Sequence, residues 1–293
     1  MLEAAEALCP GCGRENSGDA LVCALCGGIL RHVQAEPAPA VFLASAREER
    51  AQAREESAKA LEPWIYLGIG AVTALVFALT PLLGFMGWFL ASLVHEMGHT
   101  AVAWFFGMPA FPAISLEGHA ASVHSEPIAF LAVCVWAGLL GAAWHFLESR
   151  ARWIALGIVG VLYPALAFTN AKECLHLLAG HGGELAFASL CLWKALDGGF
   201  TESRLERGLY GTVGWYLLGS NVKLDLALMF SPTGRAGYAE NGSFGLTNDM
   251  IRVAEDVLGW KLQSVAFLML LAAVAALAAA FGLWRISSST RED

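Results

Sequence analysis

Charged side chains are scarce in this sequence. Only 15% of its 293 residues are Asp, Glu, Lys or Arg and 57% are hydrophobic, which excludes an ordinary soluble domain of this length. A positive surplus is missing as well, because 26 acidic residues outnumber 18 basic ones. Nucleic-acid-binding proteins need a clustered basic surface, so no nucleic-acid partner is expected. The composition predicts an integral, polytopic membrane protein of the all-α class.

The N-terminus lacks the pattern of a cleavable signal peptide, which is a basic stretch followed by an apolar one. It reads MLEAAEALCPGCGREN and has neither feature. We therefore expect the first residues to be retained and to lie in the cytoplasm.

Paired cysteines dominate the first 30 residues. The stretch CPGCGRENSGDALVCALCGG holds two Cys-x-x-Cys pairs ten residues apart, formed by Cys9, Cys12, Cys23 and Cys26. Each pair, with the glycine after it, can form a tight turn that offers two thiolates to one ion, and four thiolates complete a tetrahedral site. Because so short a segment cannot bury a stable core, the metal would supply most of its folding free energy. We predict one structural Zn²⁺ in a zinc ribbon over residues 1–30; the alternatives, two disulfides or a redox pair, fit a chain without a secretion signal less well.

The same segment resembles the small zinc-ribbon modules that precede many bacterial membrane proteins, with CPGCG and CALCG both present. The resemblance implies a cytoplasmic module with an interaction or regulatory role, which could bind a cytoplasmic protein partner. It also implies that the chain lies in a bacterial inner (plasma) membrane.

The chain changes character after the ribbon. Residues 31–62 are rich in Ala, Pro, Glu and Arg, so we expect a linker and then an exposed helix, SAREERAQAREESAKAL, with Arg and Glu at i,i+3 and i,i+4 spacings. Residues 63–293 are expected to form a transmembrane domain of about six helices plus re-entrant segments. The expected spans, each long enough to cross about 30 Å of hydrocarbon, are residues 64–83, 86–107, 127–147, 153–179, 208–231 and 263–283.

Two connecting segments stand out between these spans. Residues 108–126, MPAFPAISLEGHAASVHSE, contain two prolines and many small residues. We expect an extended or re-entrant segment beside a cavity there, since irregular backbone is tolerated at membrane depth only in such a place. Residues 232–262 are polar enough to be a loop, with NDMIRVAEDVLGW as a surface helix.

The second expected span carries the motif HEMGH. On a helix, His95 and His99 are one turn apart and project from the same face, so both imidazoles can reach a single zinc ion. Glu96 beside them can take a proton from zinc-bound water and pass it to a leaving amine. A glutamate in the middle of a span costs about 2.5–3.5 kcal/mol, which favours a functional role. The alternative is a buried polar network that joins helices without metal.

The sequence here resembles the site-2 protease family of zinc-dependent intramembrane metalloproteases. The resemblance rests on H-E-x-x-H inside a transmembrane helix, an irregular Pro/Gly-containing segment after it, and a later apolar segment interrupted by polar residues. It implies that His95 and His99 bind a catalytic Zn²⁺, that Glu96 is the general base, and that an aspartate in an LDG motif is the third ligand. It also implies a zinc metallopeptidase that cleaves membrane-embedded or membrane-adjacent peptide bonds of protein substrates.

Two sites compete for the third ligand. Asp197 in ALDGG matches the family motif literally, and His181 in GHGGE matches it in position. We favour His181, because it is expected to emerge at the level of the two motif histidines if residues 108–126 stay on one side of the membrane; a crossing by that segment is the alternative. Asp197 lies sixteen residues further on, roughly 24 Å if helical. Glu184 is expected to orient His181 or to replace it as ligand. Asp197 before Gly198 is also typical of an ordinary helix C-terminus.

A few other polar residues accompany the apolar segments. His119 and His124 are expected in a loop, where one of them could help to hold a tetrahedral oxyanion. Glu173 and His176 lie three residues apart and could form a pair that faces the cavity. An ion pair between Glu173 and Lys172 is the structural alternative.

A second class of function has to be considered beside hydrolysis. The chain could be a non-proteolytic membrane scaffold or a metal-handling protein that recruits partners through its zinc ribbon. Glu96 distinguishes the two, because a scaffold would tolerate Glu96→Gln and a protease would lose its activity with zinc still bound.

Overall fold

The chain divides into two compact units, Met1–Ala60 and Leu61–Asp293. The computed structural model describes residues 7–9, 11–16, 20, 22–28, 61–114, 120–198, 201, 203–240 and 248–292. The expected linker and the expected exposed helix lie outside the described residues as far as position 60. His119 also lies outside the described residues.

The smaller unit contains two short strands. β1 (Ala7–Leu8) pairs with β2 (Glu15–Asn16) in antiparallel register. The turn that follows each Cys-x-x-Cys pair has the same backbone pattern: Gly13 donates to the carbonyl of Cys9 at 2.8 Å, and Gly27 donates to the carbonyl of Cys23 at 3.0 Å. Both glycines have positive φ angles, 71° and 69°, which residues with a side chain rarely adopt.

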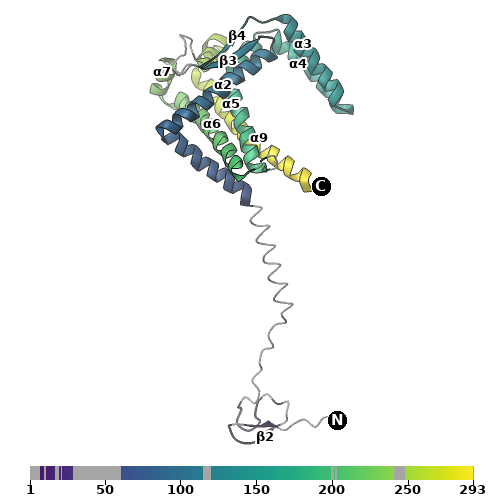
Figure 1. Ribbon diagram of the computed structural model, residues 1–293, viewed down its shortest axis with the longest axis vertical. Helices are drawn as coiled ribbons and strands as arrows, with labels where there is room; N and C mark the ends of the chain where they lie inside the picture. Colours follow the sequence, from purple (N-terminus) through teal and green to yellow (C-terminus); the bar gives the residue numbers. More distant parts are fainter. Residues whose placement is uncertain are drawn as a thin grey trace. The chain divides into compact units, whose positions relative to one another are not determined.

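The larger unit is mostly helical (Figure 1). Its long helices are Leu61–Leu79, α2 (Pro81–Phe105), α3 (Ala129–Phe146), α4 (Ser149–Ala167), α5 (Ala171–Asp197), α6 (Arg204–Phe230) and α9 (Leu262–Glu292). Five helices of the described residues are long and apolar enough to cross a membrane: Leu61–Leu79, α3, α4, α5 and α9. The expected spans in α2 and α6 form helices that fall outside this set, because the HEMGH motif and several charged residues lower their hydropathy.

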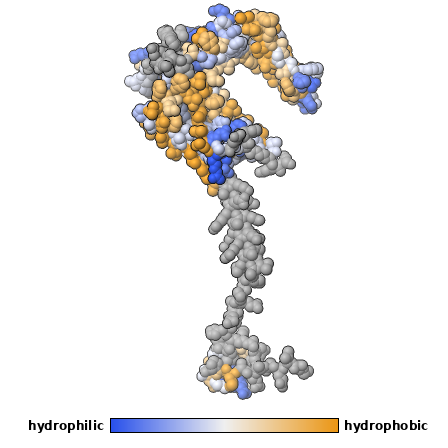
Figure 2. All heavy atoms as spheres, viewed as in Figure 1, coloured by the Kyte–Doolittle hydropathy of each residue, from blue (hydrophilic) through white to orange (hydrophobic). Residues whose placement is uncertain are grey.

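Apolar side chains also cover much of the outside of this unit (Figure 2). On α3 and α4, for example, Phe130 is 72% exposed and Val161 is 74% exposed. Such outward-facing side chains are costly in water and suit contact with lipid tails. The prediction of a membrane protein is therefore supported.

The predicted fourth span over residues 153–179 is wrong. The chain leaves helix α4 at Phe168 and starts α5 at Ala171. Thr169 explains the break, since its hydroxyl donates to the carbonyl of Ala165 at 2.6 Å and accepts from the N–H of Ala171 at 3.2 Å, in competition with the helical backbone. α5 then continues without interruption through GHGGE, so His181 lies in the middle of a helix.

Residues 108–126 contain a β-hairpin, which confirms the expectation of an extended segment. β3 (Ala110–Ile114) pairs antiparallel with β4 (Ala120–His124), with Ala110 opposite His124. The hairpin is fixed to α2 by side chains: Thr100 and Ser122 join their hydroxyls at 3.0 Å, and Trp104 donates from Nε1 to the carbonyl of Ala110 at 2.7 Å.

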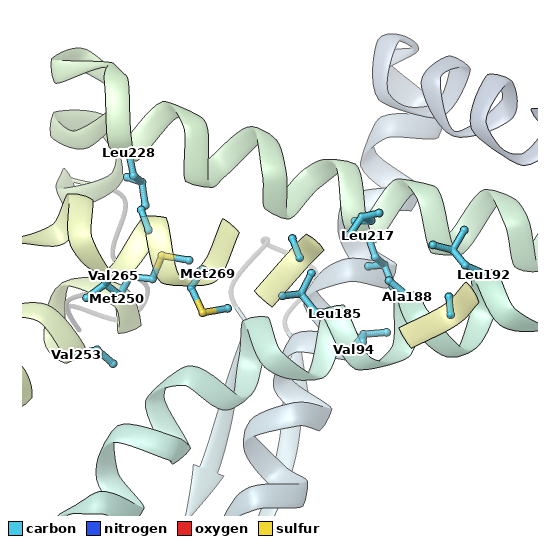
Figure 3. Close-up of a cluster of buried hydrophobic side chains, with 14 of the residues drawn as sticks. Val94, Leu185, Ala188, Leu192, Leu217, Leu228, Met250, Val253, Val265 and Met269 are labelled. Carbon is cyan, nitrogen blue, oxygen red and sulfur yellow. The ribbon is translucent and has the colours of Figure 1, made fainter. Parts of the chain in front are cut away.

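α5 is the central helix and packs against α2, α6 and α9. The largest buried cluster forms between them (Figure 3). The side chains labelled in Figure 3 are Val94, Leu185, Ala188, Leu192, Leu217, Leu228, Met250, Val253, Val265 and Met269. Glycines let α2 approach α5 closely, because a Cβ on Gly98 would overlap the carbonyl oxygen of Ala179 and one on Gly183 would lie 2.8 Å from the Cα of Gly98.

The helix predicted over NDMIRVAEDVLGW is confirmed, but its expected position on the surface of a loop over residues 232–262 is wrong. This part contains α7 (Pro232–Glu240), α8 (Asp249–Arg252) and the π-helix η2 (Val253–Leu258). Met250, Val253 and Ala254 are fully buried and belong to the same cluster as α5 and α9. The apolar residues of NDMIRVAEDVLGW therefore hold this segment inside the unit.

Candidate metal centre

Helix α2 presents the two motif histidines side by side. The Nε2 atoms of His95 and His99 are 3.1 Å apart, and His99 is almost fully buried. Pro81 starts the helix, where its missing N–H costs no hydrogen bond, and α2 continues regularly past both residues. The predicted one-turn spacing is thus realised in the structure.

A third group, Asp249, converges on the same point. Its Oδ2 lies 3.0 Å from the Nε2 of His99 and 3.4 Å from the Nε2 of His95. Asp249 is the first residue of α8, whose buried Met250 anchors it in the core. At its other end α8 is tied to α5 by Arg252, which lies 3.9 Å from the Glu173 carboxylate.

The hydrogen bonds on the far side of each imidazole fix where the ring protons are. The Nδ1 of His95 lies 3.0 Å from the Glu184 carboxylate, and the Nδ1 of His99 lies 2.7 Å from the carbonyl oxygen of His176. Both partners can only accept, so each neutral ring carries its proton on Nδ1. The two Nε2 lone pairs then face each other and the carboxylate of Asp249. Three acceptors at this distance need a cation between them, which is either a metal ion or a proton on one Nε2 atom.

The separations of these atoms fit a tetrahedral metal. Ligand atoms bound at 2.0–2.1 Å in a tetrahedron lie about 3.3 Å from one another. The three observed distances are 3.1, 3.0 and 3.4 Å. His95, His99 and Asp249 could therefore hold one metal ion and leave a fourth position open.

Gly180 keeps the space beside these atoms free. A Cβ at this position would overlap the Nε2 of His95 and lie 2.5 Å from the Nε2 of His99. Any larger residue would occupy the place where the lone pairs meet. The glycine just before His181 is thus a feature of the site that the sequence analysis did not single out.

Burial and hydrogen bonding act in opposite directions on Asp249. Burial disfavours its charge, but when ring protons on Nε2 take the place of the cation, hydrogen bonds from His95 and His99 outweigh this effect and hold the pKa of Asp249 well below its usual range. The group is therefore a carboxylate, as a metal ligand has to be.

Glu96 lies on the same turn as His95 and is buried, with 7% of its surface exposed. The backbone N–H of Ser122 in β4 faces its carboxylate. The hairpin thus lies directly beside the residue predicted to act as general base.

His181, the favoured third ligand, lies next to the centre and outside its three converging atoms. Its ring centroid is 4.7 Å from that of His95, and its Nδ1 is 3.1 Å from the Oδ1 of Asn221. Asn221 also donates to Glu184, which in turn accepts from His95. His95, His181 and Glu184 are also close enough to form a metal-binding group. The bond to Asn221 engages Nδ1 of His181 and leaves its Nε2 able to bind a metal ion, so His181 stays an alternative ligand. Glu184 was expected to orient His181. In the structure it holds Nδ1 of His95 instead.

Asp197 lies at the opposite end of α5 from the centre. Gly198 follows it with a φ angle of 64° and closes the helix, which confirms the interpretation as a helix C-terminus. Asp197 accepts a hydrogen bond from Ser287 of α9. Asp197 comes sixteen helical residues after His181, so the two residues lie roughly 24 Å apart along the axis of α5.

The four N-terminal cysteines form a second cluster that could hold a metal ion. Their Sγ atoms are 3.5 Å apart between Cys9 and Cys26 and 3.6 Å apart between Cys12 and Cys23, and all four thiols are free. Four sulfur atoms bound at 2.3 Å in a tetrahedron lie about 3.8 Å apart, close to these distances. The alternative of two disulfides is not realised.

Backbone hydrogen bonds prepare one thiolate in this cluster. The N–H groups of Cys26 and Leu25 lower the pKa of Cys23 to about 6. For Cys12 the backbone of Arg14 acts in the same direction, but the neighbouring thiols outweigh it and raise its pKa to about 12. Cys23 therefore loses its proton readily, whereas Cys12 keeps its proton unless a cation binds to the cluster.

The chain matches no protein-family model, no curated protein and no solved structure in comparisons with known proteins.

Proposed function

We propose that the chain is a zinc-dependent intramembrane endopeptidase. Its catalytic residues would be His95, His99 and Asp249 as metal ligands and Glu96 as general base. The observation that carries the proposal is that three lone-pair atoms converge on the space kept free by Gly180. The buried Glu96 directly follows one of these ligands, His95, in the sequence. The chemistry of this donor set, two imidazoles and one carboxylate, suits zinc.

The protein residues would divide the reaction between them. When bound, the zinc ion supplies a Lewis acid that polarises the substrate carbonyl and acidifies a water molecule. Glu96 removes a proton from the attacking water as the new C–O bond forms. It then delivers this proton to the amide nitrogen as the C–N bond breaks, which gives a carboxylic acid and an amine. Glu184 and the carbonyl of His176 keep the two imidazoles in the tautomer that ligation requires.

The β3–β4 hairpin supports a peptide substrate in extended form. Its strand β4 lies beside Glu96 through Ser122 and beside α2 through Thr100. An extended peptide can add to the edge of such a sheet by main-chain hydrogen bonds, which exposes its carbonyl groups. A transmembrane substrate helix would have to unwind locally to bind in this way. Membrane-embedded and membrane-associated proteins are therefore the proposed substrates.

The cysteine cluster is proposed to bind a second, structural zinc ion through Cys9, Cys12, Cys23 and Cys26. We infer that this zinc ribbon lies on the cytoplasmic side of a bacterial inner membrane and binds a protein partner. Its two matching turns and its four converging thiols support the metal assignment.

Zinc content tests the ligand assignment. Purified full-length chain should contain two zinc ions. His99→Ala and Asp249→Asn should each lose one of them, Cys9→Ser should lose the other, and Asp197→Asn should keep both. His181→Ala is the informative comparison, because retention of both ions separates Asp249 from the ligand that sequence analysis favoured. A wild-type chain that holds only the ribbon zinc would overturn the proposal.

Hydrolysis is tested in proteoliposomes with a library of lysine-flanked apolar peptides about 20 residues long, the length that spans a bilayer. In H₂¹⁸O each cleavage places one ¹⁸O atom in the new carboxyl terminus, which mass spectrometry detects. We expect labelled products with wild type and none with Glu96→Gln, although Glu96→Gln keeps both zinc ions. Two bound zinc ions without labelled products in wild type would favour the scaffold or metal-handling function instead.

A further inference from the structure

His176 is a polar residue of the centre that the proposed reaction has not yet used. It belongs to α5, and its backbone carbonyl already holds His99. Its ring centroid lies 5.3 Å from the ring of His99, and Asp249 is within electrostatic reach. The side chain thus lies against one proposed metal ligand, His99, and within electrostatic reach of a second.

The Nδ1 atom of His176 is buried and has no hydrogen-bond partner among the residues that the structure describes. A buried N–H without an acceptor is less tolerated than a bare lone pair. The neutral ring therefore keeps its lone pair on Nδ1 and carries its proton on Nε2. This leaves His176 with one N–H group that has no acceptor among the described residues.

Strand β4 links His176 to the general base. His124, at the end of β4, has its ring 4.9 Å from that of His176 at an angle of 81°, an edge-to-face contact. Two residues earlier, Ser122 faces Glu96 with its backbone N–H. Residues i and i+2 of a strand point to the same face and are about 6.5 Å apart. One strand therefore contacts Glu96 through the backbone of Ser122 and His176 through the ring of His124, at positions two residues apart.

We propose that His176 is a further catalytic residue that donates its Nε2–H to the carbonyl oxygen of the scissile peptide bond. This inference rests on the proposed function. As water adds to the carbonyl carbon, the C=O electron pair moves to this oxygen, and a neutral imidazole N–H stabilises the negative charge without transferring its proton. His124 acts as a positioning residue, because its ring packs against the ring of His176. The proton balance of the reaction stays with Glu96.

A metal-directed ligand gives a readout that does not need turnover. A fluorescein-labelled leucyl-leucine hydroxamate binds zinc through oxygen atoms that stand in for the carbonyl oxygen and the attacking water. Its affinity for the full-length chain is measured by fluorescence anisotropy, with His99→Ala as the background from the ribbon zinc. We expect His176→Phe to weaken binding about 10- to 100-fold, the size of a hydrogen bond to a charged group. His176→Gln, which keeps an N–H donor, should stay within about 5-fold of wild type.

Controls keep the outcome interpretable. His145→Phe changes an exposed histidine of α3 and should bind like wild type. Zinc content should stay at two ions in both His176 variants, because the backbone carbonyl that holds His99 is unchanged. If His176→Phe loses zinc, His176→Met serves as the second variant without a donor. Wild-type affinity in His176→Phe or His176→Met, or equal losses in Phe, Met and Gln variants, would overturn the assignment.

Turnover separates this inference from the proposed function. With a peptide that wild type cleaves, His176→Phe should lower kcat roughly 100- to 1000-fold with little change in KM, as loss of an oxyanion donor does. If wild type cleaves and Glu96→Gln does not, but His176→Phe keeps full kcat, the endopeptidase stands and the role of His176 is refuted. If wild type cleaves no library peptide, the endopeptidase itself fails.

Discussion

Replacing Gly180 with alanine is the smallest change that should empty the proposed catalytic centre. The added Cβ would overlap Nε2 and Cε1 of His95 and would lie 2.5 Å from Nε2 of His99, and real Cβ atoms essentially never approach other atoms below 3.0 Å. The overlap can be relieved only if the imidazoles turn apart or if α2 moves away from α5. Turning the imidazoles would separate the two Nε2 atoms, which are now 3.1 Å apart, and moving α2 would displace both of them from Asp249 in α8.

The size of the effect follows from what the imidazoles do. Loss of a group that merely orients a metal ligand typically costs 10- to 100-fold in metal affinity, and displacement of the ligands themselves should cost at least the upper value, about 2.7 kcal/mol. Helix propensity acts the other way, because alanine favours a helix interior over glycine by about 1 kcal/mol. Loss of zinc in Gly180→Ala therefore cannot be blamed on a weakened α5.

Gly182→Ala is the matched control. It makes the same substitution two residues further along α5, where a Cβ would meet nothing within 4 Å. Inductively coupled plasma mass spectrometry, after dialysis against a zinc buffer, should find one zinc ion per chain in Gly180→Ala and two in both wild type and Gly182→Ala. Two zinc ions in Gly180→Ala, bound with wild-type affinity, would refute the placement of the centre beside Gly180.

Two further substitutions test the support of the centre. Glu184→Gln removes the charged acceptor of the His95 Nδ1–H, so zinc affinity measured by competition with a chelator should fall about 10- to 100-fold; unchanged affinity would contradict the role given to this carboxylate. Gly98→Ala should lower the free energy of unfolding by about 1–3 kcal/mol, because its Cβ would overlap the Ala179 carbonyl where α2 crosses α5. Denaturant titration in detergent measures this, and Gly138→Ala in α3, where a Cβ meets nothing within 4 Å, should be no less stable than wild type.

Local patterns predicted the parts of the two sites that local geometry determines. Two Cys-x-x-Cys pairs place four thiols together because each turn is fixed by a few neighbouring residues. Likewise H-E-x-x-H brings His95 and His99 to one face of any helix that contains them. In both cases the spacing and the chemistry lie in the same short stretch, so the structure had little freedom to differ.

The proposed third ligand could not be predicted from the sequence because its position depends on tertiary packing. Asp249 follows His99 by 150 residues, and an acidic residue in the first turn of a helix is ordinary, since it favours the helix dipole. What brings it to the centre is the burial of Met250 and Val253 in the core. The apolar residues of NDMIRVAEDVLGW did contain that signal, but their polar flanks led to the expectation of a surface helix.

The error about residues 153–179 had a further consequence for the candidate ligands. The expected span ended before GHGGE, so His181 was placed at the opening of a new segment, at the level of the two motif histidines. Once Thr169 ends the preceding helix, His181 becomes an interior residue of α5 with Asn221 as its partner.

Helix α5 supports the two imidazoles of α2, and none of the three converging atoms belongs to it. Gly180 leaves room beside both imidazoles, the carbonyl of His176 fixes one ring, and the carboxylate of Glu184 fixes the other. These residues recur every four positions, at 176, 180 and 184, so they line one face of the helix. A helix that orients the ligands of α2 on one face and buries leucines of the core on another must carry polar residues and glycines inside an apolar span. The polar residues around GHGGE are therefore explained by support of the centre, and Asp249, held by the core from a different part of the chain, completes it.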